Sequence, residues 1–441
     1  MDKIVPNLLR IYKNRTVIPI IAQARHDRFE EVRVQLKEIV PVHLLEPAIR
    51  TFLPRVVRVF EVPITKWKKL PEFNMIATVL TPNLVEEVAQ WKTIEKIYPD
   101  YIKYALAPQY PVVPEAGVFY DYRKEAFTTT YWVKKLLGLD RANTKGFNGK
   151  GIRTVVADTG CEVKLPQVRH VKALTAMAEK GGVGVSDSNG HGTHVVSTVG
   201  GKPEVDMRYN APVEGMAPEA DLYSIQCLGF IIGIGMTSDV LQAMETALKL
   251  GAKIVSMSLG SEDSPPDDEN PEAVAVNKLT ENGILVCVAA GNAGPGPETV
   301  GSPGSCLNSL TVGAIDPLTG EIADFSSRGP TKGDRAIKPD ICSYGVRLNS
   351  QTTGLIDRMV DPSQKWYAPI SGTSMSTPTV AGFVTCLAQL YREKLGKELT
   401  VDEVKRMAEA LGHPKSNDDG FGLLDWAMVE EWVSTTYGIT L

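Results

Sequence analysis

Three short segments of the chain carry side chains that could perform nucleophilic chemistry together. The stretch VVADTG contains Asp158, NGHGTH contains His191 and SGTSMSTP contains Ser374. A serine hydroxyl becomes a useful nucleophile only when a base takes its proton, and that base needs a carboxylate to hold its tautomer and orientation. The residue types therefore predict acyl transfer, with Ser374 as nucleophile, His191 as base and Asp158 as the orienting acid.

Each of these residues is expected at the end of a secondary-structure element. The apolar run Ile152–Ala157 predicts a buried strand before Asp158, and Ser376–Lys394 predicts a long apolar helix that starts next to Ser374. Sheets covered by helices place their sites at such strand ends. A helix N-terminus also offers N–H groups and a positive dipole end to a developing oxyanion.

From residue 131 to residue 441 the sequence alternates apolar runs with helical patterns. This alternation predicts an α/β domain with a mostly parallel sheet that helices cover on both faces. The remaining expected strands are Asp221–Cys227, Lys253–Leu259, Ile284–Ala290 and Ser309–Ile315, and the expected helices include His194–Val199, Ser238–Leu250 and Pro271–Glu281.

Residues 1–106 predict a separate, small α+β domain. Two βαβ-type halves of this length are typical of a ferredoxin-like sandwich. Residues 107–130, rich in proline and tyrosine, predict an extended linker. The expected order of strands and helices is strand Thr16–Ala24, helix Phe29–Ile39, strands Val56–Ile64 and Asn74–Thr81, helix Leu84–Ile97 and strand Tyr98–Leu106.

The charge distribution argues against some partners and favours one. The net charge of -5 gives no reason to expect nucleic acid, and no run reaches the roughly 18–20 apolar residues of a membrane span. Residues 1–106 hold 17 Lys and Arg against 12 Asp and Glu, whereas the remainder holds 30 against 40. Opposite charges on the two parts favour their docking.

The N-terminus and the cysteines both indicate a reducing compartment. The stretch Met1–Ala22 lacks the roughly 7–15 apolar residues of a signal peptide, which predicts a cytoplasmic protein and leaves an unrecognised export route open. The spacing of the six cysteines matches no zinc or redox motif, and reduced, buried thiols are expected. Cys161 directly follows the Asp158 turn.

The three segments resemble the Asp, His and Ser signatures of the subtilisin-like serine peptidases, or subtilases, in that family's chain order. The stretch VAAGN resembles the segment that carries the family's oxyanion-hole asparagine, here Asn292. The stretch SMSLG resembles the strand that lines its primary specificity pocket. The resemblance covers roughly residues 131–433 and implies a serine endopeptidase that cleaves proteins or peptides through an acyl-enzyme.

The resemblance also implies the walls of the pocket for the P1 residue. Small walls favour an apolar or aromatic P1 side chain. If Glu298 and the acidic loop of residues 262–269 reach the cleft, a basic P1 residue is favoured instead. The implied wall residues are Ser258, Leu259, Gly260, Ala289, Ala290 and Gly291, with Gly301 at the floor.

The N-terminal domain resembles the family's prodomain, an intramolecular chaperone and inhibitor. This implies a self-processing zymogen that is cut after Leu106, before Ala107, although any bond from 106 to 127 stays open. A permanently attached regulatory domain is the alternative. The chemistry requires no cofactor, and structural calcium stays open because Asp187 and residues 262–269 offer oxygen ligands without a complete set.

Two other classes compete with the peptidase. A catalytically silent homologue could serve as a binding scaffold, but all four functional positions hold competent residues. A serine peptidase of the sedolisin type shares the Gly-Thr-Ser theme, yet the His191 segment and Asn292 count against it. Thr379 and Ser376 depart from the subtilase pattern without touching the proton path.

Overall fold

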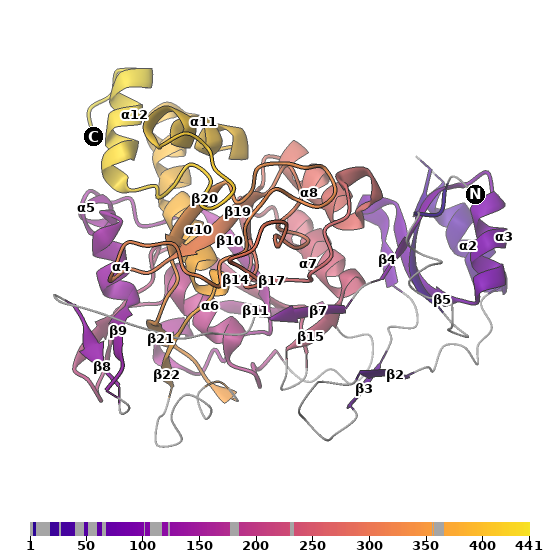
Figure 1. Ribbon diagram of the computed structural model, residues 1–441, viewed down its shortest axis with the longest axis horizontal. Helices are drawn as coiled ribbons and strands as arrows, with labels where there is room; N and C mark the ends of the chain where they lie inside the picture. Colours follow the sequence, from indigo (N-terminus) through magenta and orange to yellow (C-terminus); the bar gives the residue numbers. More distant parts are fainter. Residues whose placement is uncertain are drawn as a thin grey trace.

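The computed structural model describes an N-terminal body and a C-terminal body that lie side by side (Figure 1). The N-terminal body comprises the described residues up to 100, and the C-terminal body begins at residue 117. The described residues are 3–5, 18–25, 28–39, 48–51, 60–63, 68–100, 102–105, 117–121, 124–176, 185–229, 233–354, 356 and 366–441.

A seven-stranded sheet forms the centre of the C-terminal body. All its strand pairs are parallel, in the order β11-β14-β10-β16-β18-β19-β20. The strands are β10 (Arg153–Asp158), β11 (Lys172–Thr175), β14 (Asp221–Gln226), β16 (Ile254–Met257), β18 (Leu285–Ala289), β19 (Leu310–Ile315) and β20 (Ile341–Tyr344). The predicted parallel α/β sheet is confirmed.

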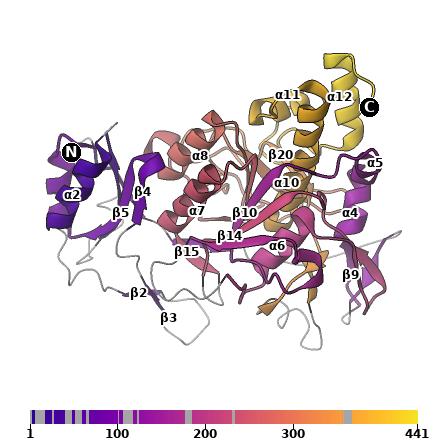
Figure 2. The same ribbon diagram turned by 180° about the vertical axis from the view of Figure 1, so that it is seen from behind.

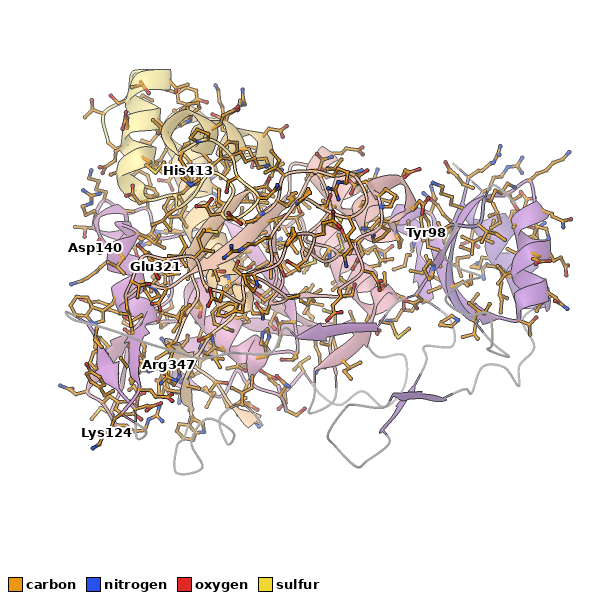
Figure 3. All side chains as sticks on the ribbon, viewed as in Figure 1. Tyr98, Lys124, Asp140, Glu321, Arg347 and His413 are labelled. Carbon is orange, nitrogen blue, oxygen red and sulfur yellow. The ribbon has the colours of Figure 1, made fainter. Side chains whose placement is uncertain are left out.

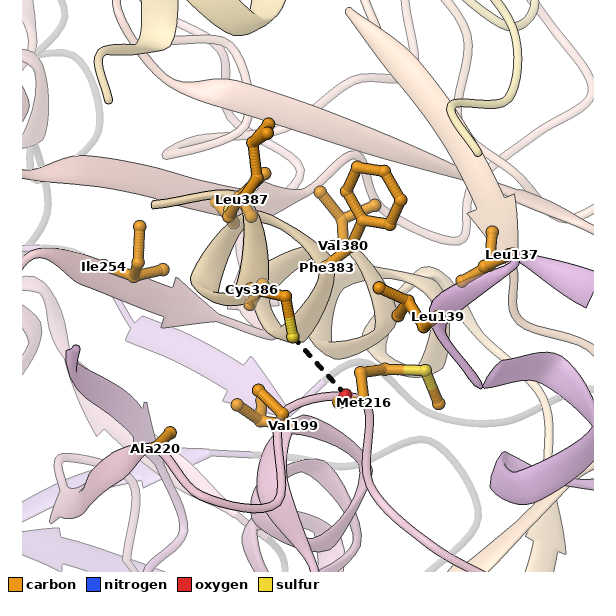
Figure 4. Close-up of a cluster of buried hydrophobic side chains, with 14 of the residues drawn as sticks. Leu137, Leu139, Val199, Met216, Ala220, Ile254, Val380, Phe383, Cys386 and Leu387 are labelled. Atoms are coloured by element: carbon orange, nitrogen blue, oxygen red, sulfur yellow. Dashed lines mark hydrogen bonds between the residues drawn. The ribbon is translucent and has the colours of Figure 1, made fainter. Parts of the chain in front are cut away.

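Helices cover both faces of this sheet, as the continuous apolar strands indicate. Val156 packs in one core with α6 (His191–Gly200) and α10 (Thr373–Leu390). Its neighbour Val155 points to the other face and packs with α7 (Thr237–Lys249) and α8 (Pro271–Glu281). Figure 4 shows part of the first core around α10, where the Cys386 thiol lies 3.6 Å from the Met216 carbonyl oxygen.

Shorter elements complete the C-terminal body (Figure 2). The six cysteines are all described, all buried, and none forms a disulfide. No helix among the described residues combines the length and apolarity needed to cross a membrane. The remaining elements are α4 (Thr130–Leu136), α5 (Leu139–Thr144), β12 (Glu204–Asp206), β13 (Ala211–Val213), β21 (Leu348–Gln351), β22 (Tyr367–Ile370), α11 (Val401–Leu411) and α12 (Trp426–Tyr437).

The N-terminal body has the predicted ferredoxin-like order, but the described part of the predicted strand Val56–Ile64 is not part of its sheet. That part, residues 60–63, pairs elsewhere, and residues 68–70 take its place. The antiparallel sheet of this body runs in the order β4-β5-β1-β6, and its two helices each connect one strand to a later one. The elements are β1 (Ile18–Ala24), α2 (Phe29–Ile39), β4 (Lys68–Leu70), β5 (Met75–Leu80), α3 (Pro82–Gln90) and β6 (Ile94–Pro99), with β2 (Ala48–Thr51) and β3 (Phe60–Pro63) as a separate pair.

One predicted helix of this body is wrong over its second half. The expected helix Leu84–Ile97 ends at Gln90, and Ile94–Pro99 forms the strand β6 instead. Ile97 lies opposite Ala22 of β1, so pairing with the sheet overrides the helical pattern. The predicted final strand is therefore split between β6 and a separate strand, β7 (Ile102–Ala105).

The sheet of the N-terminal body is buried on both faces, and the C-terminal body covers one of them. Ile20 and Ile76 pack with α2 and α3 on the outer face. Ile21 and Met75 point the other way and belong to the same apolar core as α7 and α8. Tyr98 also faces this shared core (Figure 3). The two bodies therefore share one hydrophobic interface.

The second half of the expected linker is folded onto the C-terminal body. Strand β9 (Ala126–Thr129) pairs with β21 and with the short strand β8 (Phe119–Tyr120). The adjacent Arg347 is only 1% exposed and donates 2.6 Å hydrogen bonds to Asp121 and Glu125 (Figure 3). These contacts make residues 117–129 part of the C-terminal body.

Candidate active site

Asp158 and His191 meet where β10 ends and α6 begins. The Asp158 carboxylate is fully buried, and its Oδ1 lies 2.7 Å from Nδ1 of His191. The same oxygen accepts a 2.7 Å hydrogen bond from the backbone N–H of Thr159. This contact fixes the histidine ring and favours the tautomer that protonates Nδ1, which leaves Nε2 able to accept a proton.

Ser374 occupies the first turn of α10, at the carboxyl ends of the central strands. Its Oγ donates to the carbonyl oxygen of Ser258 at 3.1 Å, and Ser258 Oγ donates back to the carbonyl oxygen of Ser374 at 3.0 Å. Nε2 of His191 has no hydrogen-bond partner among the described residues. Proton transfer thus requires the Ser374 hydroxyl to turn from Ser258 towards His191, and such contacts commonly tighten only with substrate bound.

Asn292 follows β18, and its side chain is oriented by the start of α10. Its Oδ1 accepts hydrogen bonds from the backbone N–H of Thr373 at 2.9 Å and from the Thr373 hydroxyl at 3.0 Å. A Cβ added to Gly372 would lie 3.3 Å from Nδ2 of Asn292, so the amide nitrogen lies directly beside the Ser374 turn. The amide is therefore oriented to donate to an oxyanion formed at Ser374.

The electrostatics of the site favour a protonated His191. Burial acts to lower the pKa of His191, but the charge and hydrogen bond of Asp158 and the charge of Asp187 outweigh it and raise this pKa above its ordinary value. His194, three residues later, is different. Burial lowers its pKa to about 3, and its Nε2 lies 3.0 Å from the Leu348 carbonyl oxygen, so it is a neutral structural residue.

Contacts link some of the residues predicted to line the P1 pocket, and one of them, Ser258, bonds Ser374. The N–H of Gly301 bonds the carbonyl oxygen of Ala290 at 3.3 Å, and a Cβ on Gly301 would lie 1.8 Å from the Ser261 carbonyl oxygen. Gly301 thus joins the two walls and tolerates no side chain. Leu259 contributes only backbone, because its side chain packs in the core with α7 and α8.

Acidic residues that could favour a basic P1 side chain are engaged with other groups. The carboxylate of Glu298 pairs with Arg335. Asp267 accepts from the N–H of Leu307 at 3.1 Å, and Asp268 contacts Lys96 of the N-terminal body at 3.4 Å. These partners weaken the acidic-pocket alternative for Glu298 and Asp267, and leave it open for the rest of the 262–269 loop.

A strand of the N-terminal part lies in the cleft. Strand β7 pairs antiparallel with β15 (Ile234–Met236) on one side and with β17 (Leu259–Gly260) on the other. Ala105 is opposite Leu259, and the next residue along β17 towards the site is Ser258, which contacts Ser374. The predicted cleavage residues Leu106 and Ala107 lie outside the described residues.

Asp187 does not offer its oxygens to a cation. Its oxygens accept five hydrogen bonds from N–H and O–H donors of the described residues. Among the described residues no group of three or more His, Cys, Asp and Glu side chains is arranged to hold a metal ion. Structural calcium therefore stays a prediction that rests on residues 262–269 alone.

The sequence patterns predict which residues react but do not reveal residues that orient them. Thr373 bonds Asn292 from a distant segment, so its role follows from the fold. Thr159 directly follows Asp158, and its N–H bonds the Asp158 carboxylate. Both threonines lie inside the motif segments, which is the signal that the sequence offers.

Comparison with known proteins agrees with this geometry. Residues 149–421 match the sequence model of the Subtilase family. The chain is 33% identical to serine protease AprX of Bacillus subtilis (strain 168) over 284 residues, which cover 60% of this chain and 62% of that protein. It is 31% identical to subtilisin Savinase of Lederbergia lenta over 284 residues, 64% of this chain and 92% of that protein.

A third relative is the major intracellular serine protease of Bacillus subtilis (strain 168), 30% identical over 267 residues, 59% of this chain and 75% of that protein. The family match covers more than half of the chain. The chain therefore belongs to the subtilase family of serine peptidases, which confirms the resemblance seen in the sequence.

The orientation of Asn292 generates a first prediction. Replacing Asn292 with alanine removes the amide donor beside Ser374 and should lower kcat by about 100- to 1000-fold, the loss found for such a donor in subtilisin, with KM little changed. Steady-state kinetics on a chromogenic peptide measure it, with active sites counted by titration. A KM effect without a kcat effect would contradict an oxyanion role.

Proposed function

We propose that this chain is a serine endopeptidase made as a self-processing zymogen. Ser374 attacks the scissile carbonyl, His191 takes its proton, and Asp158 holds the histidine. Asn292 and the N–H of Ser374 stabilise the oxyanion. The 2.7 Å contact between Asp158 and His191 beside the α10 N-terminus carries this proposal, together with relatives that are serine proteases.

The zymogen part of the proposal rests on the position of β7. A peptide substrate commonly binds an exposed sheet edge as an added strand, through main-chain hydrogen bonds. Strand β7 has this geometry, because it completes a three-stranded sheet with β15 and β17. The N-terminal body therefore blocks the path that a substrate would take and acts as an inhibitor.

Polar contacts hold the N-terminal body at the start of α7. The Asp100 carboxylate accepts from the N–H of Ser238 at 2.8 Å and from its hydroxyl at 2.7 Å, which caps this helix. Lys68 pairs with Asp239 in the next position, and both side chains are buried. Asp100 directly precedes the segment that leads into β7, so the cap anchors the inhibitory strand.

The register of β7 supports cleavage after Leu106. Tyr104 is opposite Gly260 and Ala105 is opposite Leu259, so one further residue along the strand corresponds to Ser258. Since Ser258 contacts Ser374, the bond after residue 106 is the one expected at the nucleophile. A leucine at P1 also agrees with the small, uncharged pocket walls.

Self-processing is tested by the intact mass of the wild-type protein beside the Ser374→Ala variant. We expect the wild type to separate into residues 1–106 and 107–441, whereas the variant stays at full length. The new N-terminus locates the cut. A wild type that stays intact yet hydrolyses casein would support a permanently attached domain, and an inactive wild type would support the silent scaffold.

The pocket walls predict substrate preference. Matched tetrapeptide substrates that differ only at P1 should give a higher kcat/KM for Phe or Leu than for Arg, because the predicted wall residues carry no charge. One methylene group in an apolar pocket already changes kcat/KM by about 10- to 200-fold. A clear preference for Arg would instead assign Glu298 or the 262–269 loop to the pocket.

Docking of the N-terminal body should depend on pH through Asp100. Burial raises the pKa of Asp100 to about 7, aided by the charge of Asp239, although the hydrogen bonds from Ser238 and the charge of Lys68 act to lower it. Released into water, the carboxyl has a pKa of about 4. Docking therefore takes up a proton, is strongest below about pH 4 and weakens as the pH rises towards 7.

The measurement is the fraction of N-terminal fragment retained with the processed protein on size-exclusion chromatography between pH 5 and pH 8, with a serine-peptidase inhibitor present. Retention should fall as the pH rises. The Asp100→Asn variant cannot titrate at this position and should lose most of this dependence. An unchanged pH profile in that variant would assign the effect to other groups.

A further inference from the structure

Asp187 is a buried carboxylate next to the catalytic groups that touches neither Ser374 nor a substrate path. It is 2% exposed and accepts five hydrogen bonds. Oδ1 receives the hydroxyl of Thr159 at 2.9 Å and the N–H groups of Asn189 at 3.1 Å and Gly190 at 2.8 Å. Oδ2 receives the N–H of Thr193 at 2.8 Å and its hydroxyl at 2.7 Å.

These donors come from both segments that carry the Asp158–His191 pair. Thr159 directly follows Asp158, whereas Gly190 and Thr193 flank His191 at the start of α6. One carboxylate therefore binds the strand-end turn and the helix N-terminus at the same time. A change in either segment would be transmitted to the other through Asp187.

The hydroxyls of Thr159 and Thr193 form two further hydrogen bonds between these segments. The hydroxyl of Thr159 accepts from the N–H of Gly192 at 2.8 Å, so the Asp158 turn binds the histidine helix. The hydroxyl of Thr193 accepts from the N–H of Glu162 at 3.0 Å, so the helix binds the turn. Each hydroxyl accepts from backbone and donates its single proton to Asp187.

The backbone of the two segments is in close contact at this point. A Cβ added to Gly192 would lie 2.3 Å from the carbonyl oxygen of Gly160, and Gly160 has φ of +108°. The contact leaves no room for a side chain or a water molecule between the segments. Asp187 bonds both segments at this point of contact and helps to hold them together.

We propose that Asp187 is a positioning residue for the catalytic pair, which locks the Asp158 turn to the start of α6 and places a second negative charge behind His191. Asp187 acts through Asp158 and His191, not on the substrate. The inference concerns the peptidase chemistry alone and does not require self-processing.

The charge of Asp187 follows from its partners. All five groups that contact the carboxylate donate a hydrogen bond to it, as suits an ionised carboxylate. A protonated Asp187 would find no acceptor for its own proton among these groups. Burial raises the pKa of Asp187, and its hydrogen bonds from Gly190, Thr193 and Thr159 oppose that rise. The groups that face this carboxylate are Thr159, Thr193, His191 and the Cys161 thiol, whose pKa burial and Asp187 raise.

The test separates charge from geometry with two variants. Asp187→Asn keeps the shape of the side chain and removes its negative charge. The new NH₂ group then faces N–H or O–H groups that can only donate to the carboxylate in the wild type. We expect kcat to fall by about 10- to 100-fold with KM nearly unchanged, since small misplacements of catalytic groups have effects of this size. The acid limb of the kcat/KM profile should also move to lower pH, because His191 loses a negative neighbour.

Thr193→Val is the companion variant, because it keeps the charge and removes one cross-link. We expect a smaller loss of kcat and an acid limb close to that of the wild type. Activity is measured per active site, by titration with a phosphonylating serine reagent, after any unprocessed chain has been cut by a trace of wild type. Thermal unfolding of each variant shows whether it is folded at the assay temperature.

Glu403→Gln is the matched control. Glu403 is also a largely buried carboxylate with several donors, among them Tyr391 at 3.0 Å and Trp432 at 3.3 Å. Tyr391 lies at the opposite end of α10 from Ser374, about 25 Å away along the helix. This variant should lose stability while it keeps the wild-type kcat and pH profile.

The proposal fails if folded Asp187→Asn has the kcat and acid limb of the wild type, or if it loses only thermal stability, as the control does. If Asp187→Asn does not fold, an unchanged kcat in Thr193→Val overturns the cross-link. Wild-type protein without activity in the same assay would instead reject the peptidase function, so the two failures are distinguishable.

Discussion

The candidate site depends on supplying one carboxylate with partners where water cannot reach it. Asp158 is fully buried, and a buried polar group is costly unless hydrogen bonds compensate it. The compensation comes from the Thr159 N–H and from His191, and therefore from a turn and a helix that the sheet brings together. The parallel strands make this possible, because β10, β16 and β18 all end at the same edge of the sheet. Asp158 is the last residue of β10, Ser258 directly follows β16, and Asn292 lies three residues after β18.

The relation between the two bodies follows from a second constraint, the burial of apolar surface. A four-stranded sheet needs cover on each apolar face, and the N-terminal body has helices for only one. The other face, with Ile21, Met75 and Tyr98, is covered by α7 and α8. Docking therefore completes the core of the N-terminal body and at the same time places β7 between β15 and β17. If the proposed inhibition holds, folding and inhibition use one interface.

The sequence predicted the parts of this molecule that are encoded locally. Asp158, His191 and Ser374 lie in short glycine-containing segments at element ends, and the strands buried on both faces are continuous apolar runs, so site and sheet could both be predicted. The helix at Leu84–Ile97 failed because strand pairing of β6 with β1 is a long-range effect. Asp187 remains a possible calcium ligand on the sequence alone, because the sequence shows an acid but not the five donors around it.

Contacts between distant residues also set the start of the C-terminal body. Arg347 is buried with Asp121 and Glu125, which precede it by more than 220 residues, and no local pattern reveals this pairing. Removing the partners of a buried guanidinium is strongly destabilising, by about 3–5 kcal/mol. A cut on the N-terminal side of Asp121 would leave both acids with the C-terminal body, whereas a cut after Asp121 would separate this residue from Arg347. Under the proposed self-processing, these contacts favour a cut ahead of Asp121, which agrees with the bond after residue 106 that the register of β7 favours.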